Sequence, residues 1–176
     1  MENGLIHIYT GEGKGKTTAA IGLAVRAAGH GLRVGIYQLC KGADTGELHS
    51  LAKLDCVSLH RANCDIKKFI WEMSDQQRAQ WRAATRTLFE KASRAAAGEG
   101  TDLVILDEVF GAMSAGAIDE GMIEQLMRTK GRGVELVLTG RNAPESLIAL
   151  SDYVTEMRCV KHPYSKGIGA RRGIEL

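Results

Sequence analysis

The sequence has 176 residues, of which 44% are hydrophobic and 25% charged, and its formal net charge is +2 at pH 7. This composition is typical of a globular protein and excludes a disordered chain, while 23 Lys and Arg against 21 Asp and Glu disfavour a nucleic-acid partner. No apolar stretch approaches the roughly 18 residues of a membrane helix, and the first residues lack a signal-peptide pattern. We therefore expect a cytoplasmic protein of one domain, residues 1–176, with no membrane partner.

Short apolar strands alternate with helical patterns along the first part of the chain. Residues 5–9 predict a strand, and after a glycine-rich turn residues 16–28 predict a helix that ends at Gly29. A second strand is expected at residues 33–39 and a weak third at 57–59, joined by a polar stretch that contains residues 41–47.

The longest predicted helix begins with a capping box, in which Gln77 follows Ser74 by three residues, and runs to about Ala97. One face has the spacing of a core face, with Trp81, Thr85, Leu88, Phe89 and Ala92. A second face carries Arg78, Arg82 and Arg86. We interpret it as a solvated face rather than an anion-binding stripe, because the net charge is close to zero.

Residues 103–106 form a continuous apolar run, which predicts a central strand buried on both faces. A helix is expected at 119–129, a strand at 134–138, a helix start at Asn142 with Pro144, and a last strand at 153–160 before a basic, irregular tail. The alternation predicts an α/β fold with a mostly parallel sheet covered by helices on both faces.

The turn after the first strand, residues 10–18, has the pattern of a phosphate loop. Gly15, Lys16 and Thr17 match the end of G-x-x-x-x-G-K-[ST], although Thr10 replaces its first glycine. Backbone N–H groups in such a turn converge on phosphate oxygens at a helix N-terminus. Lys16 and Lys14 supply cations and Thr17 a hydroxyl for magnesium. The alternative is a glycine-rich turn with lysines by chance.

Further candidate residues follow the later strands. Asp107 and Glu108 end the buried strand, where phosphate-loop proteins hold magnesium directly or through water, and parallel strands bring this end close to the loop. Arg141 follows the next strand and either reaches a phosphate oxygen or is a surface arginine. Phe69 and Trp71 either cover a flat hydrophobic ligand or anchor their loop to the core. The four cysteines form no C-x-x-C pair, so no zinc site is expected.

The sequence resembles the ATP:corrinoid adenosyltransferases of the RecA-like type over nearly its whole length. The shared stretches are residues 9–20, 106–108, 138–141 and 154–175, together with Lys41-Gly42, Gly46-Glu47 and the Phe69-x-Trp71 pair. The resemblance implies a single RecA-like phosphate-loop domain. It also implies transfer of the 5′-deoxyadenosyl group of ATP to cobalt(I) of a reduced corrinoid, with release of triphosphate, in adenosylcobalamin synthesis or salvage.

The same resemblance implies the site residues and partners. ATP would be bound by Gly11, Glu12, Gly13, Lys14, Gly15, Lys16, Thr17, Thr18 and Arg141. Mg²⁺ (or Mn²⁺) would be held by Thr17, Asp107 and Glu108, and the catalytic residues would be Lys14, Lys16, Phe69 and Trp71, with the two aromatic side chains against the corrin. The corrinoid would be cobalamin, cobinamide or cobyrinic acid diamide, the protein a homodimer, and the electron donor a reductase.

The sequence departs from the family at Glu12, where relatives often have asparagine, and an acid there repels phosphate unless it points away. Many relatives also carry a helix before the first strand, so a lid over the corrinoid is expected from elsewhere, or a more open site.

Two alternative functions share the loop. A kinase or NTPase would act at the γ-phosphate, although no acceptor-site base is evident. A non-catalytic carrier would bind ATP and corrinoid without turnover.

Overall fold

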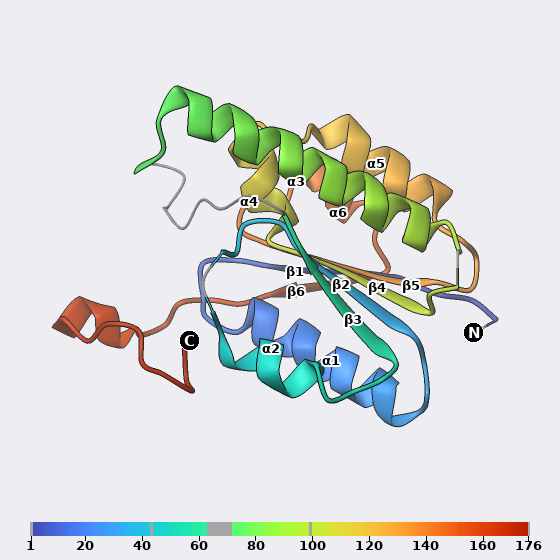
Figure 1. The fold of residues 1–176 in the computed structure, drawn as a ribbon, viewed down its shortest axis with the longest axis horizontal. Helices are drawn as coiled ribbons and strands as arrows, with labels where there is room; N and C mark the ends of the chain where they lie inside the picture. The colour runs from blue at the N-terminus through green and yellow to red at the C-terminus, as the bar shows by residue number, and fades with distance from the viewer. Residues whose placement is uncertain (1, 43, 63–71, 99, 176) are drawn as a thin grey trace.

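The structure is a computed structural model that describes residues 2–42, 44–62, 72–98 and 100–175 (Figure 1). Phe69, Trp71 and Cys64 lie outside the described residues. Six strands form one sheet in the order β3-β2-β4-β5-β1-β6, and every neighbouring pair is parallel. They are β1 (Ile6–Thr10), β2 (Val34–Gln38), β3 (Val57–Arg61), β4 (Leu103–Asp107), β5 (Glu135–Thr139) and β6 (Tyr153–Glu156).

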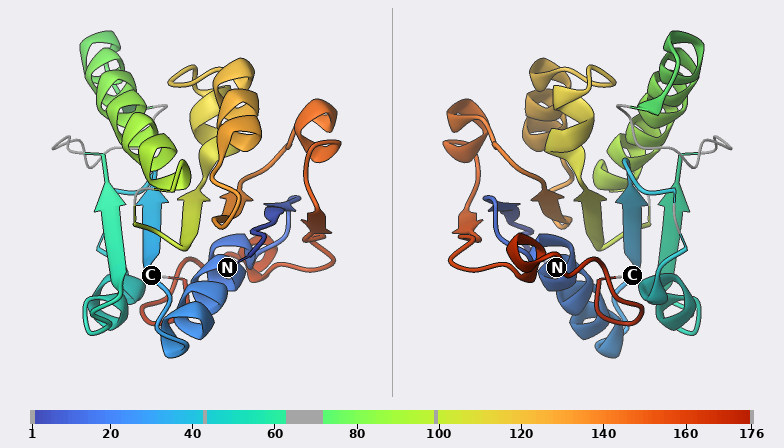
Figure 2. Two further views of the ribbon diagram at one scale, coloured as in Figure 1. Left: turned by 90° about the vertical axis from the view of Figure 1, so that its right-hand side faces the viewer. Right: turned by 90° about the vertical axis from the view of Figure 1, so that its left-hand side faces the viewer.

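Helices cover both faces of this sheet, as expected for an α/β fold (Figure 2). On one face lie α1 (Lys16–Gly29) and α2 (Gly46–Leu51). On the other lie α3 (Asp75–Ala96), α4 (Val109–Ser114), α5 (Glu120–Thr129) and α6 (Glu145–Ile148). Parallel strands need such crossover helices, and helices on both faces bury the strands between them. All five residues of β4 are accordingly buried.

A separate cluster of apolar side chains packs the helices against each face of the sheet. Leu106, Leu136 and Leu138 join Phe89 and Phe110 on the α3 face, while Ile36, Ile105 and Val137 meet three alanines of α1. The alanines, Ala20, Ala24 and Ala27, recur at helical spacing and let α1 lie close to the sheet. Because α1 begins soon after the carboxyl end of β1, its N-terminus lies at the carboxyl edge of the parallel strands.

The predicted features of α3 are confirmed except at Arg78, which is half-buried and donates from Nη2 to Met73 O at 3.4 Å. Both hydrogen bonds of the capping box are present, with Gln77 N donating to Ser74 Oγ and Ser74 N to Gln77 Oε1. The five predicted core residues are buried. Arg82 and Arg86 are exposed, as a solvated face requires, and Arg82 Nε also donates to Ala115 O at 3.0 Å.

Three expectations differ from the structure. The helices α2 and α4 were not expected, because six residues are too few to display a helical period. The last strand ends at Glu156 rather than Val160. Its neighbour β1 ends at Thr10, so Met157 N instead donates to Thr10 O at 2.8 Å and the chain turns across the phosphate loop. The tail then contains a short 3-10 helix, η2 (Pro163–Lys166).

A helix that spans a membrane needs about 18 or more mostly apolar residues. Within the described ranges, none combines the length and apolarity needed to cross a bilayer.

Candidate functional site

The predicted phosphate loop, residues 10–18, joins β1 to α1 and contacts the chain that follows β6. Gly13 N donates to Met157 O at 2.5 Å, and a Cβ on Gly13 would lie 2.6 Å from that oxygen and 2.8 Å from Arg158 O. Gly15 has φ 122°, a conformation that side chains disfavour. Glycine is therefore required at both positions, by a close backbone approach at the first and by the turn into α1 at the second.

Lys16 is the first residue of α1 and is held inside the loop. Its Nζ donates to Gly11 O at 2.6 Å and to Gly13 O at 2.8 Å, and the residue is buried. Burial lowers the pKa of Lys16, as does Arg141, while Glu108 and Glu12 oppose the shift. The amine is thus a partly desolvated cation at the floor of the loop, which suits it to bind an anion.

The loop and the acidic strand end meet, as the parallel sheet predicts. Thr17 Oγ1 donates to Asp107 Oδ1 at 2.8 Å, and Thr139 Oγ1 donates to the same oxygen at 2.8 Å. The other oxygen, Oδ2, accepts from Gln38 Nε2 at 3.2 Å and lies 3.4 Å from Lys41 Nζ. Asp107 is only 1% exposed, so these donors replace the water that its charge would otherwise require.

Glu108 follows in a left-handed conformation, with φ 61° and ψ 36°, which is uncommon for a residue with a side chain. Its backbone N donates to Thr139 Oγ1 at 2.9 Å. Glu108 also lines the cavity described in the next paragraph. Burial raises the pKa of the Glu108 carboxyl, and the neighbouring charge of Asp107 adds to the rise. A nearby cation would therefore favour the ionised carboxylate.

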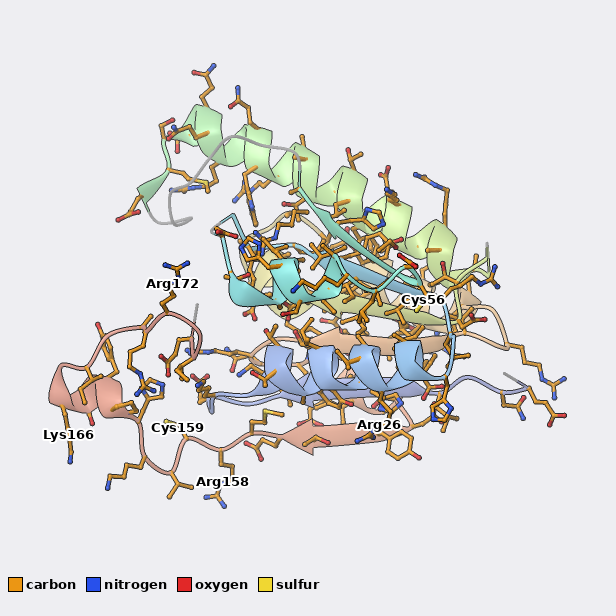
Figure 3. The ribbon with its side chains drawn as sticks, turned by 60° about the horizontal axis from the view of Figure 1, so that its bottom comes forward. Arg26, Cys56, Arg158, Cys159, Lys166 and Arg172 are labelled. Carbon is orange, nitrogen blue, oxygen red and sulfur yellow. The ribbon has the colours of Figure 1, made fainter. Side chains whose placement is uncertain are left out.

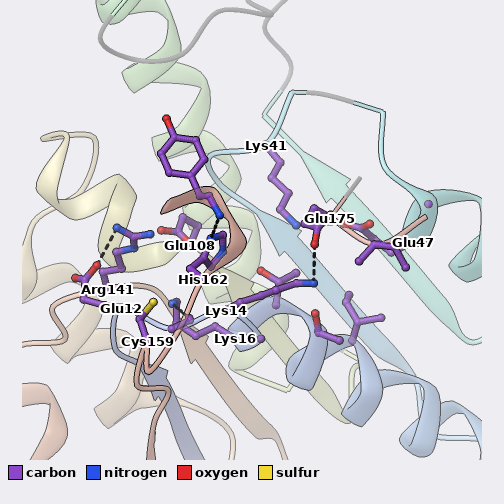
Figure 4. Close-up of a pocket in the computed structure, with 18 of the residues that line it drawn as sticks. Glu12, Lys14, Lys16, Lys41, Glu47, Glu108, Arg141, Cys159, His162 and Glu175 are labelled. Atoms are coloured by element: carbon purple, nitrogen blue, oxygen red, sulfur yellow. Dashed lines mark hydrogen bonds and ion pairs between the residues drawn. The ribbon is translucent and has the colours of Figure 1, made fainter. Parts of the chain in front are cut away.

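A cavity of about 1080 Å³ opens above the loop (Figure 4). The predicted site residues that line it are Glu12, Gly13, Lys14, Gly15, Lys16, Thr17, Thr18, Glu108 and Arg141. Gly11 and Asp107 lie behind this surface, where Gly11 holds Lys16 and Asp107 holds Thr17. The predictions for Phe69 and Trp71 concern residues outside the described ranges.

The tail forms the opposite wall of this cavity, through Cys159, His162, Tyr164, Ser165, Gly173, Ile174 and Glu175. It leaves β6 and passes the N-terminal end of α1, with Arg158 and Lys166 directed outward (Figure 3). Lys14 Nζ donates to Glu175 Oε1 at 3.2 Å. Hydrogen bonds from the Arg171 side chain, and then from its backbone N–H, lower the pKa of Glu175 to about 2, with help from Lys14. The residues alone predicted only an irregular tail, so its role as a wall was missed.

At the rim, Arg141 pairs with Glu12 at 2.9 Å (Figure 4). Both side chains are more than half exposed, at 59% and 61%. The pair explains how an acid is tolerated in a phosphate loop, because the Glu12 charge is directed to a guanidinium at the edge of the cavity. Lys41 and Glu47, which also line the cavity, pair at 3.1 Å.

The residues present fit a magnesium ion by their chemistry. The hydroxyl of Thr17 and the carboxylate of Glu108 are hard oxygen donors on the cavity wall. Asp107 already accepts from three side chains, so it fits the role of orienting Thr17 better than that of a direct ligand. No group of three or more His, Cys, Asp or Glu side chains forms a metal centre in the part of the chain that the structure describes.

Comparisons with known proteins identify relatives of the whole chain. The family model described as ATP:corrinoid adenosyltransferase BtuR/CobO/CobP matches residues 2–176. A corrinoid adenosyltransferase of Sinorhizobium sp is 38% identical over 99% of this chain and 81% of its own length. Proteins of the same name from Pseudomonas aeruginosa and Escherichia coli K12 are 35% and 33% identical over 99% of this chain, covering 85% and 86% of their own lengths.

Proposed function

This chain belongs to the ATP:corrinoid adenosyltransferase family, and from that premise we propose that it transfers the 5′-deoxyadenosyl group of ATP to cobalt(I) of a reduced corrinoid and releases triphosphate. Membership makes it a transferase that adenosylates corrinoids. The ATP-dependent reaction is supported above all by one observation. Lys16 is held by two loop carbonyls at the floor of a large cavity, beside the Thr17–Asp107 contact.

The proposed step is a displacement at carbon. The cobalt(I) electron pair attacks the 5′-carbon of the ribose, the C5′–O bond breaks, and its electron pair leaves with the triphosphate, so cobalt is formally oxidised to cobalt(III). The leaving group is a polyanion, and the cations of Lys14 and Lys16 together with the loop N–H groups stabilise the charge that grows on it. No general base is needed. The remaining task is to align cobalt, carbon and leaving oxygen.

Magnesium (or manganese), when bound, supplies further positive charge to the phosphate oxygens. In this proposal Thr17 and Glu108 provide its protein oxygens and Asp107 orients the Thr17 hydroxyl. The other residues of the proposed nucleotide site are Gly11, Glu12, Gly13, Gly15, Thr18 and Arg141. The resemblance assigns contact with the corrin to Phe69 and Trp71, which lie outside the described residues. In this proposal a homodimer is the working form, and a reductase supplies the electrons.

A product analysis tests the proposed function directly. The protein is incubated with Mg²⁺, ATP and chemically reduced cobalamin, cobinamide or cobyrinic acid diamide in separate reactions. We expect a light-sensitive cobalt–carbon bond and intact triphosphate in equal amounts. ADP with free phosphate in the absence of corrinoid would instead indicate a kinase or NTPase, and tight binding of both ligands without alkylated cobalt would indicate a carrier.

A further inference from the structure

A row of polar side chains crosses the carboxyl edge of the sheet, and part of it lies outside the site described above. The register pairs Gln38 of β2 with Arg61 of β3 on one side and with Asp107 of β4 on the other. Directly paired residues of neighbouring strands point to the same face of a sheet. Arg61 Nε donates to Gln38 Oε1 at 2.8 Å, and Gln38 Nε2 donates to Asp107 Oδ2 at 3.2 Å. The row therefore ends on the carboxylate that holds Thr17.

Gln38 is fully buried and does not line the cavity. A buried amide is costly unless its donors and acceptor are all used. Here they are used, because Nε2 also donates to Glu47 Oε1 at 3.3 Å. The amide thus bridges two carboxylates and one guanidinium.

These partners allow the Gln38 amide only one orientation. A guanidinium has no acceptor, and ionised carboxylates have no donor. Turning the amide over would place its NH₂ against Arg61 and its oxygen against Asp107 and Glu47. Arg61 therefore fixes the direction in which Gln38 donates, and Arg61 is itself linked to the loop before α2 by donation from Nη2 to Thr45 Oγ1 at 3.1 Å.

The orientation of the Asp107 carboxylate depends in part on the hydrogen bond that it accepts from Gln38. Its Oδ1 is held by two threonine hydroxyls, whereas among the described residues Oδ2 accepts from Gln38 at 3.2 Å and lies 3.4 Å from Lys41 Nζ. The Lys41 side chain is 30% exposed and flexible, so it defines an angle less well than a buried amide does. Without Gln38, Oδ2 would lose its buried donor, and the plane of the carboxylate that accepts from Thr17 would be less well defined.

We propose that Gln38 is a positioning residue, which orients Asp107 and through it the Thr17 hydroxyl for the metal–nucleotide complex. The role rests on the proposed function, since it requires that Thr17 serve a bound Mg²⁺–ATP. Partners of this kind typically change metal affinity about 10–100-fold when they are removed. Gln38 is therefore expected to matter for the Mg²⁺ requirement rather than for corrinoid affinity.

The test measures binding of ATP by calorimetry across a series of Mg²⁺ concentrations, without corrinoid. Gln38→Met keeps the length of the side chain and removes both hydrogen-bonding ends. We expect the Mg²⁺ concentration for half-maximal ATP binding to rise about tenfold. A rise below threefold in a folded Gln38→Met variant overturns the inference, whereas a wild-type protein that binds no Mg²⁺–ATP overturns the proposed site itself.

Two further variants separate positioning from packing. Thr85→Val removes another fully buried polar group, whose hydroxyl donates to Leu39 O on the opposite face of the sheet. It is expected to lower the melting temperature as Gln38→Met does and leave the Mg²⁺ requirement unchanged. In an Asp107→Asn background, Gln38→Met should add little to the Mg²⁺ requirement, because the two residues act through one contact. Equal effects of Gln38→Met in both backgrounds contradict the proposal, as does an altered Mg²⁺ requirement in Thr85→Val.

Discussion

At the scale of single residues, the site depends on charges that are held before any ligand arrives. Lys16 is fixed by two carbonyls, Asp107 by hydroxyl and amide donors, and Glu12 by Arg141. Each charge therefore has a defined position, which reduces the rearrangement needed when a polyanion binds.

Replacement of Lys16 tests the loop. Lys16→Ala removes one cation and its hydrogen bonds to phosphate, each worth about 1.5–3 kcal/mol when a charged group takes part. We expect ATP binding to weaken about 10–100-fold or more, measured by calorimetry. Lys53→Ala, which changes an exposed lysine that does not line the cavity, is the control and should bind ATP normally. Near-normal affinity in Lys16→Ala would remove the loop from the mechanism.

Ionisation of Glu47 makes the stability of the fold depend on pH. Burial opposes its ionisation, but its own backbone N–H, Lys41 and the Thr45 hydroxyl lower its pKa to about 2. This value lies below the roughly 4.3 of an unfolded glutamate, so the carboxylate stabilises the fold fully above about pH 4.5 and loses this contribution as the pH falls toward 2. Because the pair is partly exposed and screened, the contribution is on the order of 1 kcal/mol.

The measurement compares the free energy of unfolding of the wild type and Glu47→Gln from pH 7 to the lowest pH at which both fold. The difference between the two proteins is expected to shrink below about pH 4.5. A difference that stays constant down to pH 3, or that grows on acidification, would contradict the assignment of a stabilising carboxylate.

At the scale of elements, short connections bring the site together more than the long helices do. The turn after β1 and the chain after β6 share hydrogen bonds in which Met157 N donates to Thr10 O and Gly13 N to Met157 O. The helix α3, by contrast, packs against the far face of the sheet and contributes core rather than site residues. The two kinds of element should therefore respond differently to substitution.

Gly13→Ala tests the contact between the loop and the tail. Its new Cβ would meet backbone oxygens of Met157 and Arg158, which can move only if the tail moves. We expect a stability loss of about 1–3 kcal/mol, weaker ATP binding and faster proteolysis of the tail. Gly22→Ala, inside α1 with open space around the new methyl group, should instead stabilise the fold by about 0.5–1 kcal/mol. Equal stability of the two variants would mean that the tail does not cross the loop in solution.

Ser74→Ala tests the independence of α3. Loss of the capping box should reduce the free energy of unfolding by about 1 kcal/mol, measured by urea denaturation, and leave ATP affinity unchanged. Ser93→Ala, within the same helix, removes only a hydroxyl that donates to Phe89 O and should change stability by less than about 0.5 kcal/mol. A large loss of ATP affinity in Ser74→Ala would show that α3 does influence the site.

At the scale of the whole molecule, β6 is an end strand of the sheet, and no strand among the described residues pairs with its outer edge. All four residues of β6 are exposed, including Tyr153 at 51% and Val154 at 45%. Open edge strands invite pairing with another chain unless something covers them. Such a surface is compatible with the homodimer in our proposal.

Light scattering after size-exclusion chromatography tests the expected dimer. The chain has a mass of 19.0 kDa, so the dimer should give about twice that value. A constant mass near 19.0 kDa at every concentration used for activity measurements would contradict the proposed homodimer and leave the nucleotide site unaffected.

Most features that depend on residues close together in the sequence were predicted, whereas most that depend on contacts between distant residues were not. The capping box of α3 and the apolar run of β4 each lie within a short stretch of chain, and both predictions from residue spacing are confirmed. The phosphate loop was predicted in the same way, and its binding of phosphate stays a prediction. Helices α2 and α4 were missed because they are shorter than two helical turns. The end of β6 was placed too late because the length of its neighbour β1 decides where pairing stops.

Contiguous patterns in the sequence predicted the strands and the helices other than α2 and α4, the loop that resembles a phosphate-binding turn and the family to which the chain belongs. The three-dimensional arrangement was needed to see that the tail forms a cavity wall, that Glu12 pairs with Arg141 and that Gln38 lies between Arg61 and Asp107. The physical reason is that these contacts join residues far apart in the chain. They depend on which strands become neighbours in the order β3-β2-β4-β5-β1-β6, and no local spacing encodes that order.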